Sequence, residues 1–247
     1  MTTPTALITG GTTGIGRVTA ELLHERGYRV MITGANPATL AAAREALPDD
    51  VIIVDADSRS LSDADRLAEA VRTEFGTLTT VFLNAGVTKP APIEAIDEGT
   101  YDDLFAINTK GQFFTLQKVM PFIADGSSII FTVGIGATRG LPGGSATAAS
   151  KGALLAMVPS LAIELAPRRI RVNAVSPGST ETPIWAKLAG SPEAAAALQN
   201  AVAATIPFGR IGTAREVAEI VAFLASDGAA YITGQNICVG GGSGVAA

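Results

Sequence analysis

Cysteine and histidine are almost missing from this chain of 247 residues, which contains only Cys238 and His24. One cysteine excludes an internal disulfide and fits a reducing compartment. The apolar run around Cys238 predicts a buried thiol. One histidine excludes, within a single chain, a multi-histidine zinc site and a histidine-based nucleophile triad. His24 stands among charged residues of an expected helix and is interpreted as a surface residue, so the sequence predicts no metal site.

Positive charge is also scarce. Charged residues make up 17% of the chain, the formal net charge is −5, and there is no run of basic residues. The electrostatic footprint of a nucleic-acid-binding protein is therefore missing. The first residues show no basic segment followed by an apolar stretch, and no uninterrupted apolar run is long enough to cross a bilayer. We expect a cytoplasmic protein that has neither nucleic acid nor membrane as a partner.

Short apolar runs alternate with longer helix-like segments along the chain. Strands are expected at 5–9, 28–33, 51–54, 79–84, 128–133, 170–175 and around 236–239, and helices at 14–26, 37–47, 61–75, 100–123, 147–167 and 214–225. This alternation predicts an α/β fold of the Rossmann type, a doubly wound parallel sheet with helices on both faces. No Pro/Gly/Ser-rich linker divides the chain. Residues 1–247 are therefore interpreted as a single dinucleotide-binding and catalytic domain, with 183–213 as a candidate substrate-covering segment.

A glycine-rich turn follows the first expected strand directly. Gly10, Gly14 and Gly16 let the backbone turn sharply and approach a ligand closely. The helix that begins there presents unpaired N–H groups and the positive end of its dipole, which suits a pyrophosphate. A glycine cluster alone could be only a tight turn, but its position between the first strand and the first helix favours a cofactor cradle.

Further motifs appear in order along the rest of the chain. They are Asp57-Ser58 after the third strand, Asn84-Ala85-Gly86 at the end of the fourth, Asn108, Ser150-Lys151, the segment 171–178 with Thr182, and Thr233-Gly234-Gln235. Together with the Gly-x-x-x-Gly-x-Gly spacing of the turn, this set resembles the short-chain dehydrogenase/reductase family over nearly the whole chain. The resemblance implies an NAD(P)(H)-dependent oxidoreductase of a small-molecule alcohol or carbonyl, assembled as a homotetramer or a homodimer.

The resemblance also implies a role for each of these positions. The pyrophosphate and ribose would be lined by Gly10, Thr12, Gly14, Ile15 and Gly16, the adenine edge by Asp57 and Ser58, the ribose border by Asn84, Ala85 and Gly86, and the nicotinamide side by Pro177, Gly178, Thr180 and Thr182. Lys151 would bond the nicotinamide ribose, and Asn108 would hold a water beside it. Pro177-Gly178 could instead be only a turn.

The end of the second strand reads Thr33-Gly34-Ala35-Asn36 and carries neither an acid nor a base. A carboxylate at this place accepts from the ribose 2′-OH and repels a 2′-phosphate, and a basic residue does the reverse. Thr33 and Asn36 would offer a 2′-phosphate only neutral donors, which bind it less strongly than charged donors. The missing acid favours NADP(H) and the missing base opposes it. On balance we favour NADP(H) over NAD(H).

The two hydroxyl residues that the family uses for proton transfer are replaced. Where the resemblance places the catalytic Tyr, four residues before Lys151, stands Thr147, and the position of the catalytic Ser falls on Gly134. An aliphatic hydroxyl is a much weaker acid than a phenol, although it could donate a hydrogen bond or hold a water. General acid catalysis typically contributes about 10²–10⁴ in rate. Asn108, Lys151 and Thr147 therefore form the candidate catalytic set of an altered active site.

Three functions stay open on this sequence. The first is an oxidoreductase with the altered site, the second a catalytically silent or regulatory dinucleotide-binding protein, and the third a non-redox or unusual-substrate enzyme on the same fold. Thr132, Thr138 or Ser145 could supply a substitute hydroxyl, although such residues commonly bond local backbone. Pro159 predicts a bend inside the helix expected at 147–167.

Overall fold

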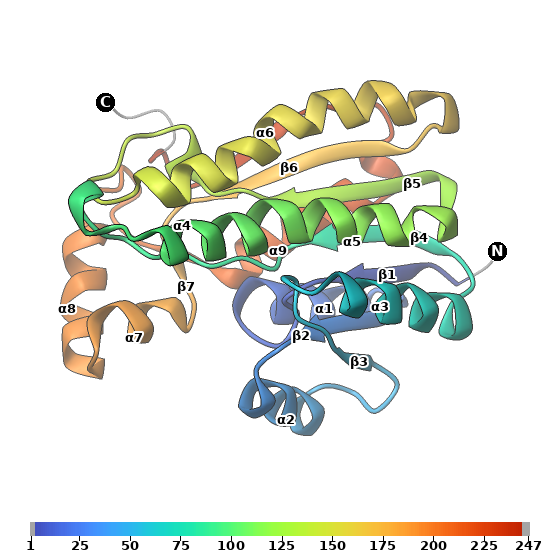
Figure 1. Ribbon diagram of the computed structural model, residues 1–247, viewed down its shortest axis with the longest axis horizontal. Helices are drawn as coiled ribbons and strands as arrows, with labels where there is room; N and C mark the ends of the chain where they lie inside the picture. Colours follow the sequence, from blue (N-terminus) through green and yellow to red (C-terminus); the bar gives the residue numbers. More distant parts are fainter. Residues whose placement is uncertain (1–2, 244–247) are drawn as a thin grey trace.

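The computed structural model describes residues 3–243 and contains one sheet of seven parallel strands (Figure 1). The strands are β1 (Thr5–Ile8), β2 (Arg29–Gly34), β3 (Ile52–Asp55), β4 (Leu78–Leu83), β5 (Ile123–Thr132), β6 (Arg171–Pro177) and β9 (Asn236–Val239), in the spatial order β3-β2-β1-β4-β5-β6-β9. The strand order reverses between β1 and β4, and in doubly wound sheets ligands bind outside the carboxyl ends of the strands at such a point. The predicted Rossmann-type sheet is confirmed.

Helices cover both faces of this sheet. On one face lie α3 (Leu61–Glu74), α5 (Gln112–Val119) and α6 (Ser145–Leu165), and on the other lie α1 (Gly14–Glu25), α2 (Pro37–Ala46) and α9 (Ala214–Ala225). Neighbouring strand residues alternate between the two cores: Leu7 packs with the first set and Ile8 with the second. Both are fully buried. Because both faces are covered, the strands read as continuous apolar runs.

The long helix predicted over 100–123 is wrong in detail. It is divided into α4 (Glu98–Phe105), a π-helical turn (Ala106–Gly111) and α5, and a 3-10 turn (Met120–Phe122) then leads into β5, which begins five residues before the predicted start at 128. The π turn carries Asn108, which is fully buried. Such turns inside α-helices occur frequently at functional sites. Hydrophobic periodicity does not reveal this local widening.

The segment 183–213 contains two helices, α7 (Ile184–Ala189) and α8 (Pro192–Ala203), which extend beyond the carboxyl ends of the strands (Figure 1). A small parallel pair, β7 (Thr180–Glu181) with β8 (Gly212–Thr213), joins the two ends of the segment. The indole Nε1 of Trp185 donates to the carbonyl of Thr180 at 2.8 Å. The β7–β8 pair and this hydrogen bond fix where the segment leaves the sheet. The substrate-covering role of the segment stays a prediction.

The structure tests the predicted burial of Cys238 and the predicted surface position of His24. Cys238 is exposed, so the predicted burial is wrong. It lies on β9, which is an edge strand of the sheet formed by residues 3–243. His24 lies on α1 with its Nε2 2.9 Å from Asp50 Oδ1 in a surface contact, as the interpretation of a surface residue expects. The helix α6 continues through Pro159, which is exposed.

By length and composition alone, one described helix could cross a membrane. It is α6 with its 3-10 extension, Ser145–Arg168. This helix packs along β6 and carries the buried Lys151, and a helix that covers a sheet has the same apolar character. Such a helix alone is weak evidence for a membrane span, and the absence of a membrane partner stays a prediction.

Candidate functional site

The glycine-rich turn between β1 and α1 has no room for a side chain at Gly10 or at Gly16. A Cβ on Gly10, whose φ is +62°, would lie 2.8 Å from the Cα of Ala85, and a Cβ on Gly16 would lie 2.3 Å from the Gly10 carbonyl oxygen. Gly14 has a φ of +56° at the start of α1. Asn84 braces the turn, because its Nδ2 donates to the carbonyls of Thr9 and Gly10. The turn therefore brings backbone close to where a pyrophosphate would bind at a helix N-terminus.

The carboxyl end of β2 lies against this turn. The Gly11 amide donates to the carbonyl of Thr33 at 2.9 Å, and Thr33 itself is buried. The hydroxyls of Thr12 and Thr39 are 3.1 Å apart. Asn36 caps α2, since its Oδ1 accepts from the amides of Ala38 and Thr39. The structure thus places neutral side chains and backbone amides here, in agreement with the sequence.

The pair expected at the adenine edge follows β3. The Asp57 carboxylate accepts from Arg59, with Nη2 to Oδ2 at 2.7 Å, and the hydrogen bonds from Arg59 hold its pKa below the usual range. The Ser58 carbonyl lies so close to Gly111 that a Cβ there would be 2.3 Å from it. The π turn therefore packs directly on the loop that follows β3.

Lys151 and Asn108 meet against Gly86. A Cβ on Gly86 would lie 2.4 Å from Lys151 Nζ and 3.1 Å from Asn108 Oδ1. Lys151 is 8% exposed, and its Nζ donates to the Thr132 carbonyl at 3.0 Å. Burial lowers the pKa of Lys151 to about 8, because desolvation disfavours the ammonium. An ammonium in such a place needs acceptors, and ribose hydroxyls could supply them.

The side-chain amide of Asn108 makes three hydrogen bonds within the protein. Its Oδ1 accepts from the Val87 amide at 2.8 Å, and its Nδ2 donates to the Val87 carbonyl and the Ser150 hydroxyl, both at 2.9 Å. Asn108 therefore fixes the start of the loop that follows β4. Whether it also holds a water beside Lys151 stays a prediction.

Thr147 lies one turn before Lys151 on α6. Its Oγ1 accepts from the Lys89 amide at 3.3 Å. Gly134, at the end of β5, has a φ of +107°, and a Cβ there would have only the Pro177 carbonyl within 4 Å, at 3.9 Å. Space for a side chain is thus present at Gly134, but the backbone conformation is one that L-residues rarely adopt.

The segment after β6 closes the site on its other side. A Cβ on Gly178 would lie 2.8 Å from Gly240 Cα, so this glycine allows a close approach of two backbones. The Thr180 hydroxyl donates to the Gly178 carbonyl. Thr182 contacts the glycine-rich turn, since its Cγ2 is 3.4 Å from where a Gly14 Cβ would stand. The turn and the predicted nicotinamide side therefore lie together.

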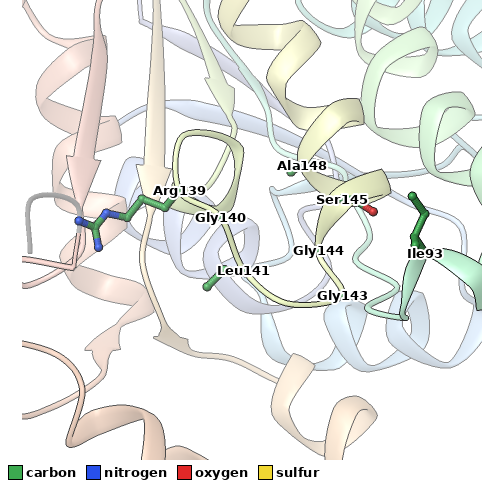
Figure 2. Close-up of a pocket in the computed structure, with 8 residues that line it drawn as sticks. All are labelled: Ile93, Arg139, Gly140, Leu141, Gly143, Gly144, Ser145 and Ala148. Carbon is green, nitrogen blue, oxygen red and sulfur yellow. The ribbon is translucent and has the colours of Figure 1, made fainter. Parts of the chain in front are cut away.

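A pocket of about 390 Å³ opens beside the first turn of α6 (Figure 2). Ile93 and Leu141, both strongly exposed, form part of its lining together with Ser145 and Ala148. Arg139 belongs to the same loop, and its side chain extends away from Ile93 (Figure 2). The residues that line this pocket include neither Thr147 nor Lys151. Within residues 3–243, no group of three or more His, Cys, Asp or Glu side chains could hold a metal ion.

Sequence reasoning missed two residues that order the site. Thr9 Oγ1 accepts from the amides of Asn84 and Ala85 at 2.9 and 3.0 Å, which joins the ends of β1 and β4. Lys89 contacts Thr147 through its backbone, 58 residues along the chain. The position of Thr9 just before the glycines was a usable signal, whereas no local pattern marks Lys89.

The fold and this site define a dinucleotide-binding α/β protein. Residues 10–244 match the family described as enoyl-(acyl carrier protein) reductase. The chain is 36% identical over 244 residues to the 3-oxoacyl-(acyl-carrier-protein) reductase of Thermotoga maritima, covering 96% of each chain. It is 37% identical to the oxidoreductase asL5 of Sarocladium schorii, covering 98% of this chain and 96% of that one.

Solved structures of reductases also superpose on this chain. A levodione reductase superposes with a TM-score of 0.89 at 31% identity and covers 99% of this chain and 98% of that one. A 3-ketoacyl-(acyl-carrier-protein) reductase of Brucella melitensis, complexed with NADH, superposes with a TM-score of 0.87 at 29% identity and covers 98% of each. The chain belongs to the short-chain dehydrogenase/reductase family, whose members are oxidoreductases that bind nicotinamide dinucleotides.

Proposed function

We propose that this protein interconverts an alcohol and a carbonyl of a small-molecule substrate with a nicotinamide dinucleotide, through an altered active site. The observation that carries the proposal is the buried Lys151 ammonium beside Gly86, one helical turn from the Thr147 hydroxyl and next to an intact glycine-rich turn. Burying this charge is unfavourable unless acceptors meet it, and a cofactor ribose offers them.

The residues that would hold the cofactor lie along one edge of the sheet. The pyrophosphate would lie over the turn at Gly10, Gly14 and Gly16, where no Cβ is tolerated at the first and last positions. Lys151 would donate to the nicotinamide ribose. When bound, the cofactor supplies or accepts the hydride, so the protein's own residues only need to orient the substrate and handle a proton.

The proton transfer is the altered step. Thr147 could donate a hydrogen bond to the substrate oxygen, but its aliphatic hydroxyl is a very weak acid. The proton would therefore come from solvent and reach the substrate oxygen through a relaying water. Since general acid catalysis usually contributes about 10²–10⁴ in rate, we expect slow turnover of ordinary ketones. The pocket that Ile93 and Leu141 line would hold the apolar body of the substrate.

A silent cofactor-binding protein is the second candidate, and Gly134 favours it. The φ of +107° at Gly134 does not suit a serine, so the position carries no polarising hydroxyl and is not prepared for one. Such a protein would bind the dinucleotide through the same residues without turnover.

NADP(H) is proposed as the preferred cofactor, because the end of β2 carries no carboxylate to repel a 2′-phosphate. A homotetramer or homodimer is proposed as the assembly. Its support is apolar exposure on α5 and α6, where Phe113 is 39% and Ile163 is 77% exposed. Light scattering on a size-exclusion column would measure the assembly, and a monomer would contradict it.

The deciding experiment has two parts. NADPH and NADH are first titrated and binding is followed by nicotinamide fluorescence. Oxidation of NADPH or NADH is then assayed with 3-oxoacyl and levodione substrates, and reduction of NADP+ or NAD+ with an aldohexose, the compounds that the names of the related proteins carry. Binding with turnover supports the oxidoreductase, binding without turnover on any of them supports the silent protein, and no binding contradicts both.

A further inference from the structure

The loop 87–91, which connects β4 to the 3-10 turn Ile93–Ala95, is held by contacts from three other elements. Asn108 accepts a hydrogen bond from the Val87 amide at 2.8 Å and donates one to the Val87 carbonyl at 2.9 Å. The Lys89 amide donates to Thr147 Oγ1 at 3.3 Å. The Ala91 amide donates to the Gly143 carbonyl at 3.0 Å. This loop therefore lies between the buried site and the start of α6.

The side chain of Lys89 extends the same attachment to α4. Its Nζ lies 2.6 Å from Asp103 Oδ2, with the two side chains 42% and 22% exposed. The other carboxylate oxygen of Asp103 accepts from Arg59 at 3.2 Å, and Arg59 also binds Asp57. The hydrogen bond from the Lys89 ammonium is the largest cause that lowers the pKa of Asp103. Desolvation opposes it, and the hydrogen bond from Arg59 lowers this pKa further. Shared charges of this kind restrain a loop more than an isolated exposed pair does.

The hydroxyl of Thr147 makes a different contact from the hydroxyls of two other helical threonines, Thr19 and Thr73. Thr19 and Thr73 donate to the carbonyl four residues earlier, at 2.7 and 3.0 Å. The carbonyl four residues before Thr147 belongs to Gly143 and accepts from Ala91. Among the hydrogen bonds of residues 3–243, the Thr147 Oγ1 only accepts, from the Lys89 amide. Its proton is thereby left for an acceptor outside these contacts.

We propose that Lys89 and Asp103 are positioning residues, whose ion pair holds the 89 amide on Thr147 and so turns the Thr147 hydroxyl into a hydrogen-bond donor toward the substrate oxygen. This inference rests on the proposed function, because it assigns the donor role to Thr147. No bond to carbon changes in this step: the amide proton stays on nitrogen, and the hydroxyl proton is shared with the substrate oxygen. The pair acts through the loop and does not touch the substrate.

The test compares Lys89→Met and Asp103→Asn with the matched control Lys118→Met. Lys118 forms an equally short pair, 2.6 Å from Asp65, between α5 and α3. With the best substrate of the panel, the first two variants are expected to lower kcat about tenfold while the NADPH Kd changes less than twofold, since small misplacements of a catalytic group have large effects on rate. Lys89→Arg keeps a cation beside Asp103 and is expected to retain the wild-type kcat. Lys118→Met should also leave kcat unchanged.

A coupling experiment separates positioning from general damage. Thr147→Val removes the hydroxyl at nearly constant volume and should lower kcat at least tenfold. In that background Lys89→Met should lower kcat no further, because both changes remove the same interaction. Independent, fully additive effects, or a wild-type kcat in Lys89→Met, would overturn the inference.

Amide hydrogen exchange tests the inference even if the protein shows no turnover. A lack of turnover by itself would contradict only the proposed function. Lys89→Met, Asp103→Asn and Thr147→Val should each speed exchange in the peptide that covers 87–91 at least threefold, with the midpoint of global unfolding unchanged. Lys118→Met should leave this peptide unaffected. Unchanged exchange in the first two variants would overturn the inference, whatever the activity.

Discussion

The buried ammonium of Lys151 predicts a pH-dependent stability in the cofactor-free protein. Burial lowers the pKa of this side chain from 10.5 to about 8. Each tenfold change in proton affinity corresponds to about 1.4 kcal/mol, so the ammonium destabilises the folded state by about 3 kcal/mol at neutral pH. Between pH 8 and pH 10.5 the unfolded chain binds the proton and the folded chain does not. Stability therefore rises with pH in that window and is insensitive to this group below it.

The matching variant is Lys151→Met, which keeps most of the volume and removes the charge. The free energy of unfolding of wild type minus that of Lys151→Met should rise by about 2–3 kcal/mol between pH 7 and pH 10. Taking the difference removes the contributions of other groups that titrate in this range. The absolute difference at pH 7 will be smaller than the burial penalty, because the variant also leaves the Thr132 carbonyl without its 3.0 Å partner.

Urea unfolding at fixed protein concentration, at several pH values and without cofactor, measures this difference. Lys110→Met is the control, since Lys110 is exposed on the π turn and its replacement removes a lysine without removing a buried one. A flat difference curve for Lys151→Met, or one that falls with pH, would show that the Lys151 ammonium is well solvated and would refute the reasoning.

Three further predictions concern the cofactor and the proton donor. Gly14→Asp places a side chain and a negative charge at a φ of +56° in the turn and should weaken NADPH binding at least tenfold by calorimetry; unchanged affinity would remove the assignment of the turn. Ala35→Arg should tighten NADP(H) binding roughly tenfold or more and leave the affinity for NAD(H) nearly unchanged, because charge-assisted bonds to the 2′-phosphate contribute about 1.5–3 kcal/mol. Parallel changes in both affinities would mean that residue 35 does not face the 2′ position. Thr147→Tyr should raise the rate of ketone reduction, because the pKa of a phenol one turn from Lys151 would be lowered, unless packing the ring costs about 1–3 kcal/mol. If the wild type turns over a substrate and the folded, cofactor-binding variant is no faster, the missing phenol is no deficit.

The backbone at Gly134 limits how both missing hydroxyls could be restored. Gly134→Ser combined with Thr147→Tyr would supply the two hydroxyl residues that the family uses. At a φ of +107° a serine at 134 would be strained by an amount of order 1–3 kcal/mol. The single change at 147 is therefore the better test, and the double variant should unfold at a lower temperature than Thr147→Tyr in a thermal scan.

The parts of the fold that sequence reasoning captured are those determined by local pattern. Leu7 and Ile8 lie in an apolar run that is buried by the helices on both faces of the sheet, and the glycines at 10, 14 and 16 stand between the first strand and the first helix, which favours a cofactor cradle. The π turn at Asn108 was not predictable, because five- and four-residue backbone spacings leave similar hydrophobic periods. The exposure of Cys238 was not predictable either, since apolarity does not say that a strand lies at an edge.

Long-range contacts limited the prediction of the site in the same way. The sequence placed Thr147 and Lys151 on one helix face, because four residues make about one turn. It gave no sign that Lys89 would meet Thr147 or that Arg59 would occupy the Asp57 carboxylate. Asp57 was expected at the adenine edge, and the structure adds that an adenine amino group would have to share this carboxylate with a guanidinium.

Lys151 links these observations to function more directly than Thr147 does. In a site with a tyrosine, a lysine four residues later lowers the pKa of the phenol, and that use disappears when threonine takes the position. Yet the ammonium remains buried at an energetic disadvantage, with a single carbonyl partner among residues 3–243. A ribose that adds hydroxyl acceptors would offset part of that disadvantage, so cofactor binding should raise the pKa of Lys151 and flatten the pH dependence of stability between pH 8 and pH 10. Urea unfolding repeated with saturating NADPH measures this, and an unaltered slope would argue that Lys151 does not contact the cofactor.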